Sequence, residues 1–142
     1  MPIEYRVDHE RRIILSRIHG TLTDDDAFHY QAALGSRPEL AGYDELADMT
    51  DVVEIVLPSP DRVRDLAWFS ATMDRPDQPS RLAIVAPTDL AFGLGRMYEA
   101  YRSAHPGSNR SVGVFRTRGE AVAFLGLTEA SQPSERPVTA HS

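Results

Sequence analysis

The sequence contains no cysteine and no lysine, and both absences narrow the classes of protein it can belong to. Without cysteine there is no disulfide framework, no thiolate nucleophile and no cysteine-ligated zinc or iron–sulfur site. The fifteen basic residues are all arginine, they are scattered along the chain, and the formal net charge is −6. This charge, without a basic cluster, argues against nucleic acid as a partner.

Long uncharged apolar runs are also missing. No segment is long enough to span a bilayer, and the first residues alternate as a strand does, which differs from the apolar core of a signal peptide. The sequence therefore predicts a cytoplasmic protein without a membrane span. Its 142 residues leave room for one domain with a proper core and hardly for two.

Apolar patterns predict five strands, at residues 5–8, 12–19, 45–53, 82–86 and 112–115. The first two strands form a hairpin through the polar residues 9–11. Segment 82–86 is apolar without alternation, as is typical of a central parallel strand that is buried on both faces. Glycine 20 is expected to end the second strand.

Four helices are predicted from their capping residues. Thr23 is followed by three aspartates, which favour the positive end of a helix dipole. Ser59 is expected to cap the second helix with Pro60 at its first position, Thr88 caps the third, and Thr117 opens a capping box. Helical spacing predicts a buried stripe of Ala27, Tyr30 and Leu34 in the first helix. In the third helix it predicts a buried stripe of Leu90, Leu94, Met97, Tyr101 and Ala104.

After the first hairpin, strands alternate with helices in the order β-β-α-β-α-β-α-β-α. This order predicts one α/β domain over residues 1–127, with a mixed five-stranded sheet, about four helices and parallel neighbours joined by crossovers. Residues 128–142 are polar, rich in serine and proline and without a period, so we expect a disordered C-terminal tail.

Three segments, in this order, resemble the stand-alone bacterial proteins of the STAS (SpoIIAA-like) family. They are GTLTD at residues 20–24, LAIVAPTDLAFGLGRMYEA at residues 82–100 and VFRTRGEAVAFL at residues 114–125. The resemblance extends over about residues 3–127 and implies a SpoIIAA-like fold. It is specific for the fold and weak for function, because most such stand-alone proteins are uncharacterised.

The resemblance implies two roles. The best-known STAS domains are anti-sigma-factor antagonists that are switched by phosphorylation in an Asp-Ser-Gly-type turn after the third strand. Here residues 48–60, which include the end of that strand and the segment after it, contain no Asp-Ser-Gly. Ser59 is the candidate phosphoacceptor, although a simple helix cap is the preferred interpretation. The family is also related to the CRAL-TRIO lipid-transfer fold, which implies a small apolar ligand.

No residues form a recognisable catalytic or metal site. The aspartates at 24–26 point about 100° apart on a helix and cannot converge on one cation. His19, Asp48 and Ser59 can be assembled into a triad on paper, but no Gly-x-Ser-x-Gly elbow marks a nucleophile. The glycines at 93–95 lie inside a helix, where close packing or a flexible turn explains them better than a dinucleotide site.

Two groups of side chains are candidates for binding. Trp68 and Phe92 are predicted to point away from the core, with Arg96 near Phe92, which indicates a partner surface and a homodimer unless another helix buries them. A ligand crevice is expected beyond the carboxyl ends of the parallel strands. Its candidate residues, which could equally be caps and loop anchors, are Thr50, Asp51, Thr88, Asp89 and Arg116.

The sequence therefore predicts a non-catalytic interaction or regulatory module that needs no cofactor and is homodimeric or binds a protein partner. A carrier or sensor of a small apolar, lipid-like ligand is the alternative, and an enzyme comes last. A large apolar pocket between sheet and helices would favour the carrier over the module.

Overall fold

A computed structural model describes residues 2–127, in which five strands form one sheet in the order β1-β2-β3-β4-β5. The strands are β1 (Ile3–Asp8), β2 (Ile13–Thr23), β3 (Asp44–Val56), β4 (Ser80–Val85) and β5 (Arg110–Phe115). Strand β1 is antiparallel to β2, and the other neighbours are parallel. The predicted mixed five-stranded sheet is confirmed. The predicted tail, residues 128–142, lies outside the described residues.

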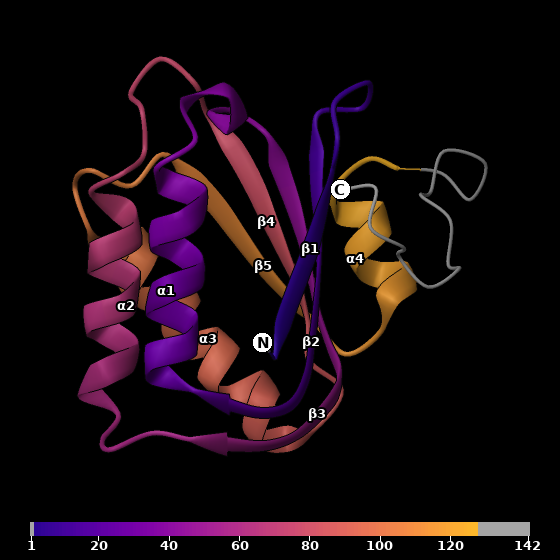
Figure 1. Ribbon diagram of the computed structural model, residues 1–142, viewed down its shortest axis with the longest axis vertical. Helices are drawn as coiled ribbons and strands as arrows, with labels where there is room; N and C mark the ends of the chain where they lie inside the picture. The colour runs from indigo at the N-terminus through magenta and orange to yellow at the C-terminus, as the bar shows by residue number, and fades with distance from the viewer. Residues whose placement is uncertain (1, 128–142) are drawn as a thin grey trace.

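Three helices cover one face of the sheet, and a shorter one lies on the other face (Figure 1). Helices α1 (Asp24–Gly35), α2 (Asp61–Ala71) and α3 (Asp89–Ala104) each connect two parallel strands, so crossovers of one hand place them on the same side. Helix α4 (Arg118–Phe124) follows β5 and packs on the opposite face, and a short 3₁₀ helix, η1 (Pro38–Leu40), precedes β3.

Three of the four predicted helix caps are confirmed. The Thr23 hydroxyl accepts a hydrogen bond from the backbone N–H of Asp26, whose carboxylate accepts from the Thr23 N–H, which completes a capping box. Thr88 and Thr117 each accept from the backbone N–H three residues later. These bonds satisfy N–H groups that have no partner within the helix.

The predicted Ser59 cap is wrong. Helix α2 begins at Asp61, its N-cap residue is Pro60, and no side-chain hydrogen bond caps it. Pro60 already has helical angles, φ −60° and ψ −24°, so the chain turns into the helix through the proline. The Ser59 carbonyl then accepts the backbone N–H of Arg62 at 3.1 Å.

Neighbouring residues of the central strands contribute to two separate cores. Ile14 and Ile84 pack under α1–α3, whereas Ile13 and Ala83 pack against α4 on the other face. Alternation along a strand turns successive side chains to opposite faces. This double burial confirms the prediction for residues 82–86, the segment that forms the interior of β4.

The predicted stripe of α3 is correct in part: Leu94, Met97 and Tyr101 are half-buried and pack against the core, but the most buried side of the helix lies about one position away. The buried residues are Ala91, Gly95, Tyr98 and Arg102, while Leu90 is 58% exposed. Small residues allow the helix to approach β5 closely, since a Cβ atom added at Gly95 would lie 2.9 Å from a methyl carbon of Val114. Close packing, predicted for residues 93–95, is confirmed at Gly95.

Strands β2 and β3 continue past the rest of the sheet. Strand β4 ends beside Asp48, but β3 runs on to Val56 and pairs there with β2, which itself passes Gly20 and ends at Thr23. The register shifts twice in this extension, and Gly20 adopts φ +68°. This extension, the β2–β3 ribbon, curves below the helical layer (Figure 1).

Candidate functional site

An apolar cavity of about 150 Å³ lies between the sheet and helices α1, α2 and α3. We call it the inner cavity. Strands β1–β4, the β2–β3 ribbon and the three helices all contribute to its walls. Its apolar lining includes Ile3, Ile18, Leu22, Ala27, Ala47, Met49, Ile55, Leu57, Val63, Leu66, Leu82, Ile84, Ala91 and Leu94. Several of these are only half-buried, among them Leu57 and Leu66, so the cavity reaches the surface between the ribbon and α2.

A buried carboxylate, Glu45 on β3, stands at one end of the inner cavity. The Tyr30 hydroxyl donates to it at 2.6 Å and the Ser16 hydroxyl at 3.3 Å, both to Oε2. The other oxygen, Oε1, accepts from Nη2 of Arg110 at 2.8 Å. A buried charge is tolerated when it is paired and hydrogen-bonded, and Glu45 has both kinds of partner.

Tyr30 is held in its neutral form. Burial of the phenol raises the pKa of Tyr30 well above its ordinary value, and the negative charge of Glu45 raises it further. The hydroxyl therefore remains a donor to Glu45 at neutral pH.

A second hydrogen-bonded chain begins at Tyr98, which also lines the inner cavity. The Ser70 hydroxyl donates to the Ala67 carbonyl at 3.2 Å, so the contact of 2.7 Å between Ser70 and Tyr98 has the tyrosine as donor. Nε of Arg102 donates to the Tyr98 oxygen at 3.3 Å. Both tyrosines thus present their rings to the cavity while their hydroxyls bond to the protein.

An ion pair lies at the end of the cavity formed by the first turns of α1 and α2. Nε of Arg62 donates to Asp24 at 2.6 Å, and the guanidinium lies 4.4 Å from the centre of the Phe28 ring. The hydrogen bond from Arg62 holds the pKa of Asp24 below its usual range. These charges are therefore matched without a ligand.

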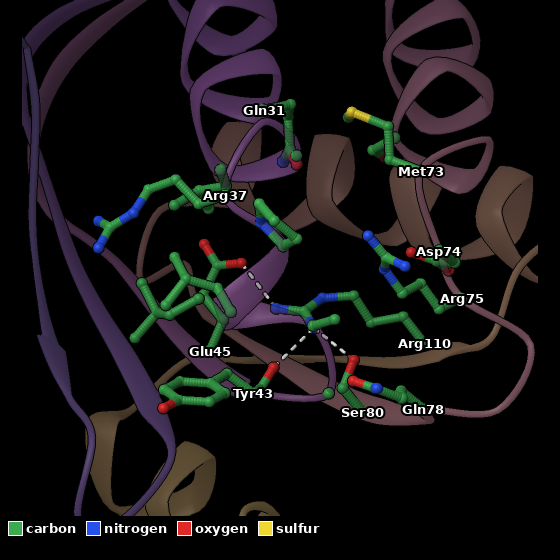
Figure 2. Close-up of a pocket in the computed structure, with 18 of the residues that line it drawn as sticks. Gln31, Arg37, Tyr43, Glu45, Met73, Asp74, Arg75, Gln78, Ser80 and Arg110 are labelled. Atoms are coloured by element: carbon green, nitrogen blue, oxygen red, sulfur yellow. Dashed lines mark hydrogen bonds and ion pairs between the residues drawn. The ribbon is translucent and has the colours of Figure 1, made fainter.

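A second cavity of about 110 Å³, the arginine pocket, lies where the carboxyl ends of α1 and α2 meet the amino ends of β4 and β5. Figure 2 shows Arg110 reaching across it, with its guanidinium bonded to Glu45, to the Tyr43 carbonyl at 2.9 Å and to the Ser80 hydroxyl. Arg75, in the loop between α2 and β4, also lines the pocket. Glu45 lines both cavities and so forms part of the wall between them.

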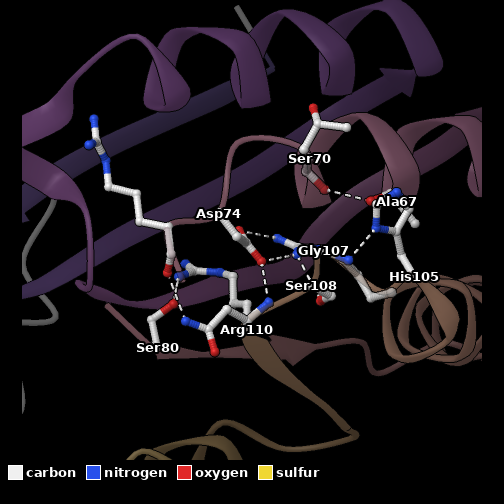
Figure 3. A network of polar contacts seen from close by, with 12 residues as sticks. Ala67, Ser70, Asp74, Ser80, His105, Gly107, Ser108 and Arg110 are labelled. Carbon is white, nitrogen blue, oxygen red and sulfur yellow. Dashed lines mark hydrogen bonds and ion pairs between the residues drawn. The ribbon is translucent and has the colours of Figure 1, made fainter. Parts of the chain in front are cut away.

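The side of this pocket is closed by the ion pair between Arg102 and Asp74. Figure 3 shows the polar contacts around Asp74. Arg102 is almost completely buried and also donates to the Ser108 hydroxyl at 3.0 Å. Asp74 additionally accepts the backbone N–H of Asn109 at 2.8 Å. The network ties the segments that precede β4 and β5 to each other and leaves both charges paired.

The predicted crevice residues separate into two groups. Thr50 bonds to Asp48, and Asp51 pairs with Arg17 on β2. The other three lie together beyond β4 and β5. Thr88 caps α3, and Arg116 donates to Asp89 at 2.8 Å and to the Pro87 carbonyl at 3.2 Å. None of the five lines the inner cavity or the arginine pocket, and their binding role stays a prediction.

The two predicted surface aromatics do not share one surface. Trp68 is 46% exposed and touches Arg64 and His105 with its ring. Phe92 is half-buried against the core with Arg116 4.3 Å from its ring centre, so the prediction that it points away from the core is wrong. Trp68 lies against His105, which is thirteen positions after Phe92 along α3 and its C-cap, so the two aromatics are about 20 Å apart at about 1.5 Å per residue.

Arg96 lies on the exposed side of α3, where it pairs with Glu99 at 3.2 Å. Among residues 2–127, no group of three His, Asp or Glu side chains lies close enough to hold a metal ion. The triad that can be drawn on paper is not assembled, because His19 contacts Glu4 and Asp48 pairs with Arg118. No helix of the described chain is long and apolar enough to cross a membrane.

Sequence reasoning missed the polar residues that separate the two cavities. Glu45 lies two residues before Ala47, and both face α1–α3 from β3. Arg102 follows Tyr98 by one helical turn on the buried side of α3. Glu45 and Arg102 are charged residues at the spacing of a buried face, and a pattern based on hydrophobicity alone does not detect them.

The fold is similar to that of a crystal structure of an uncharacterised DUF3478-family protein from Shewanella loihica PV-4, which is described as SpoIIAA-like. The TM-score is 0.54 with 18% sequence identity, over 87% of this chain and 93% of that one. No protein-family model matches the sequence, and no curated protein does either. The chain has a SpoIIAA-like fold, as its three matching segments implied.

Proposed function

We propose that this chain is a non-catalytic binding module that holds a small, neutral, apolar molecule in its inner cavity. The observation that carries the proposal is the cavity itself, about 150 Å³ with mainly aliphatic walls. An apolar cavity of about this size can hold a molecule as large as benzene. The protein would then act either as a sensor that responds to the bound molecule or as a carrier of that molecule.

The polar groups at the cavity ends favour a ligand without a charge or a hydrogen-bonding group. The Glu45 and Tyr30 side chains already bond to each other, the Tyr98 hydroxyl bonds to Ser70, and Asp24 pairs with Arg62. A charged ligand would lose its hydration and find no unmatched partner here, whereas an apolar ligand loses nothing.

Ligand size also sets the affinity that an experiment must detect. The best small ligands gain about −1.5 kcal/mol per heavy atom, so a six-carbon ring binds no more tightly than roughly the micromolar range. Titrations with benzene and toluene should therefore extend to millimolar concentrations. Binding is followed by NMR shifts of the methyl groups that line the cavity.

One substitution fills the cavity, and a matched one does not. Ala27→Leu adds volume from α1 into the cavity, while Ala32→Leu adds the same atoms on the exposed side of the same helix. We expect shifts at Ile18, Ile55 and Leu94 that disappear in Ala27→Leu and persist in Ala32→Leu. Equal shifts in both variants, or none in the natural protein, would contradict the proposal. Native mass spectrometry of the purified protein would also reveal a retained ligand.

The second candidate function is a homodimeric interaction module, and the exposed Trp68 favours it. Its ring is flanked by Arg64 and His105, a combination typical of interface anchors. The two functions are compatible, because Trp68 does not line the inner cavity.

A further inference from the structure

We propose that the arginine pocket is a binding site for a small anion, with a carboxylate or phosphate group held by Arg75. This site lies across Glu45 from the inner cavity. The proposal does not depend on the apolar ligand, since the two cavities differ in chemistry and share only part of a wall.

Four arginines line the pocket, and three of them are paired, which leaves one cation available. Arg37 pairs with Glu39 at 3.0 Å. Glu45 is matched by Arg110 and Asp74 by Arg102, both at hydrogen-bonding distance. Within residues 2–127, the Arg75 side chain makes no hydrogen bond or ion pair; only its backbone carbonyl is used, by Gln78 and Asn109. An incoming anion therefore meets an unmatched guanidinium.

Further donors surround the space that an anion would occupy. Arg110 has five N–H groups and makes three hydrogen bonds, which leaves two N–H groups over. The amides of Gln31 and Gln78 also line the pocket and can each donate. Since a guanidinium presents parallel N–H groups that match carboxylate and phosphate oxygens, Arg75 suits this class of ligand.

The volume and the local field limit the ligand to a small group. About 110 Å³ corresponds to roughly three or four water molecules at about 30 Å³ each. The carboxyl ends of α1 and α2 face the pocket and bring partial negative charge. Binding should therefore depend strongly on Arg75 and weaken as salt screens its charge.

Isothermal titration calorimetry of the full chain with sodium acetate and, separately, sodium phosphate tests the site. We expect saturable binding of at least one anion, and at least about tenfold weaker binding in Arg75→Gln, because charge-assisted hydrogen bonds are the strong ones. Arg96→Gln is the matched control, since it removes the same charge from the exposed side of α3. It should bind as the natural protein does.

Thermal unfolding without anion separates binding from folding. Arg75→Gln should keep its midpoint, because Arg75 has no partner to lose, and Arg75→Lys should recover only part of the affinity. Tighter binding of acetate would identify a carboxylate ligand, and tighter binding of phosphate a phosphate ligand. Absence of saturable binding, or equal loss of affinity in Arg75→Gln and Arg96→Gln, would overturn the proposal.

Discussion

Among single residues, Glu45 is a buried charge that lines both cavities. It is 3% exposed, it accepts hydrogen bonds from Tyr30, Ser16 and Arg110, and it stands between two cavities of opposite character. Removing one partner of such a buried charge leaves the other unmatched, which costs more than the pair contributes when intact. Glu45 therefore contributes a paired carboxylate to the wall that the two cavities share.

Replacing Tyr30 by phenylalanine should make stability less dependent on alkaline pH. The raised pKa of Tyr30, caused first by burial and then by Glu45, means that the folded state keeps a proton that the unfolded state loses above about pH 10. Stability from this group is complete below that pH and falls as pH rises, by up to about 1.4 kcal/mol per pH unit.

The measurement is the free energy of unfolding in urea from pH 7 to pH 11. At pH 7, Tyr30→Phe should be less stable by about 1–3 kcal/mol, because Glu45 loses a donor. The difference should shrink above pH 10. A gap between Tyr30→Phe and the natural protein that stays constant to pH 11 would contradict the assignment.

Sequence alone predicted Tyr30 as buried but not what its hydroxyl bonds to. Its place on the stripe of α1 follows from helical spacing, and this is confirmed by its burial. The partner Glu45 lies fifteen residues later on a strand, and only the packing of α1 on the sheet brings the two together. Such a contact depends on tertiary geometry that no local pattern contains.

At the scale of elements, α3 offers two glycines whose substitution should have opposite effects. Gly93 faces open space, and nothing lies within 4 Å of a Cβ atom added there. A Cβ atom at Gly95 would lie 2.9 Å from Val114, whose branched side chain is stiff. We expect Gly93→Ala to stabilise the protein by about 0.5–1 kcal/mol through helix propensity, and Gly95→Ala to destabilise it by about 1–3 kcal/mol.

Chemical denaturation of the two variants measures these effects. The residues lie in one helix and the change is the same methyl group, so each serves as the control for the other. If both substitutions stabilised the protein, α3 would not pack closely on β5.

The helices show why elements were predictable and their orientations were not. Thr23, Thr88 and Thr117 cap helices through bonds within three residues, so local sequence determines them. The buried face of α3 is set instead by how closely it approaches Val114, which favours Ala91 and Gly95 over the larger Leu90. Hydrophobicity alone therefore placed the centre of the buried stripe about one position away from where it lies.

The β2–β3 ribbon has a similar explanation. Gly20 suggested the end of a strand, but its φ of +68° lets β2 shift register and continue beside β3. The ribbon adds Leu22 and Ile55 to the inner cavity. A site built partly from this extension could not be located from strand ends, which is why the predicted crevice and the inner cavity differ.

At the scale of the whole molecule, the shape of the fold leaves Trp68 on the outside of the helical layer. It is 46% exposed although tryptophan is among the residues that gain most from burial. A two-fold contact needs only one self-complementary patch, so a second copy of the chain is the simplest partner. Phe92, which is covered by Arg116, is not expected to take part.

We expect the natural chain to sediment as a dimer at tens of micromolar and Trp68→Ala to shift toward the monomer. An interface anchor contributes about 2 kcal/mol or more, so the dissociation constant should rise at least about thirtyfold. Val53→Ala is the control, because Val53 is 85% exposed on the β2–β3 ribbon and removes apolar surface elsewhere. A monomeric natural protein would contradict the dimer. Dimerisation that is lost in Val53→Ala and kept in Trp68→Ala would place the interaction surface away from Trp68.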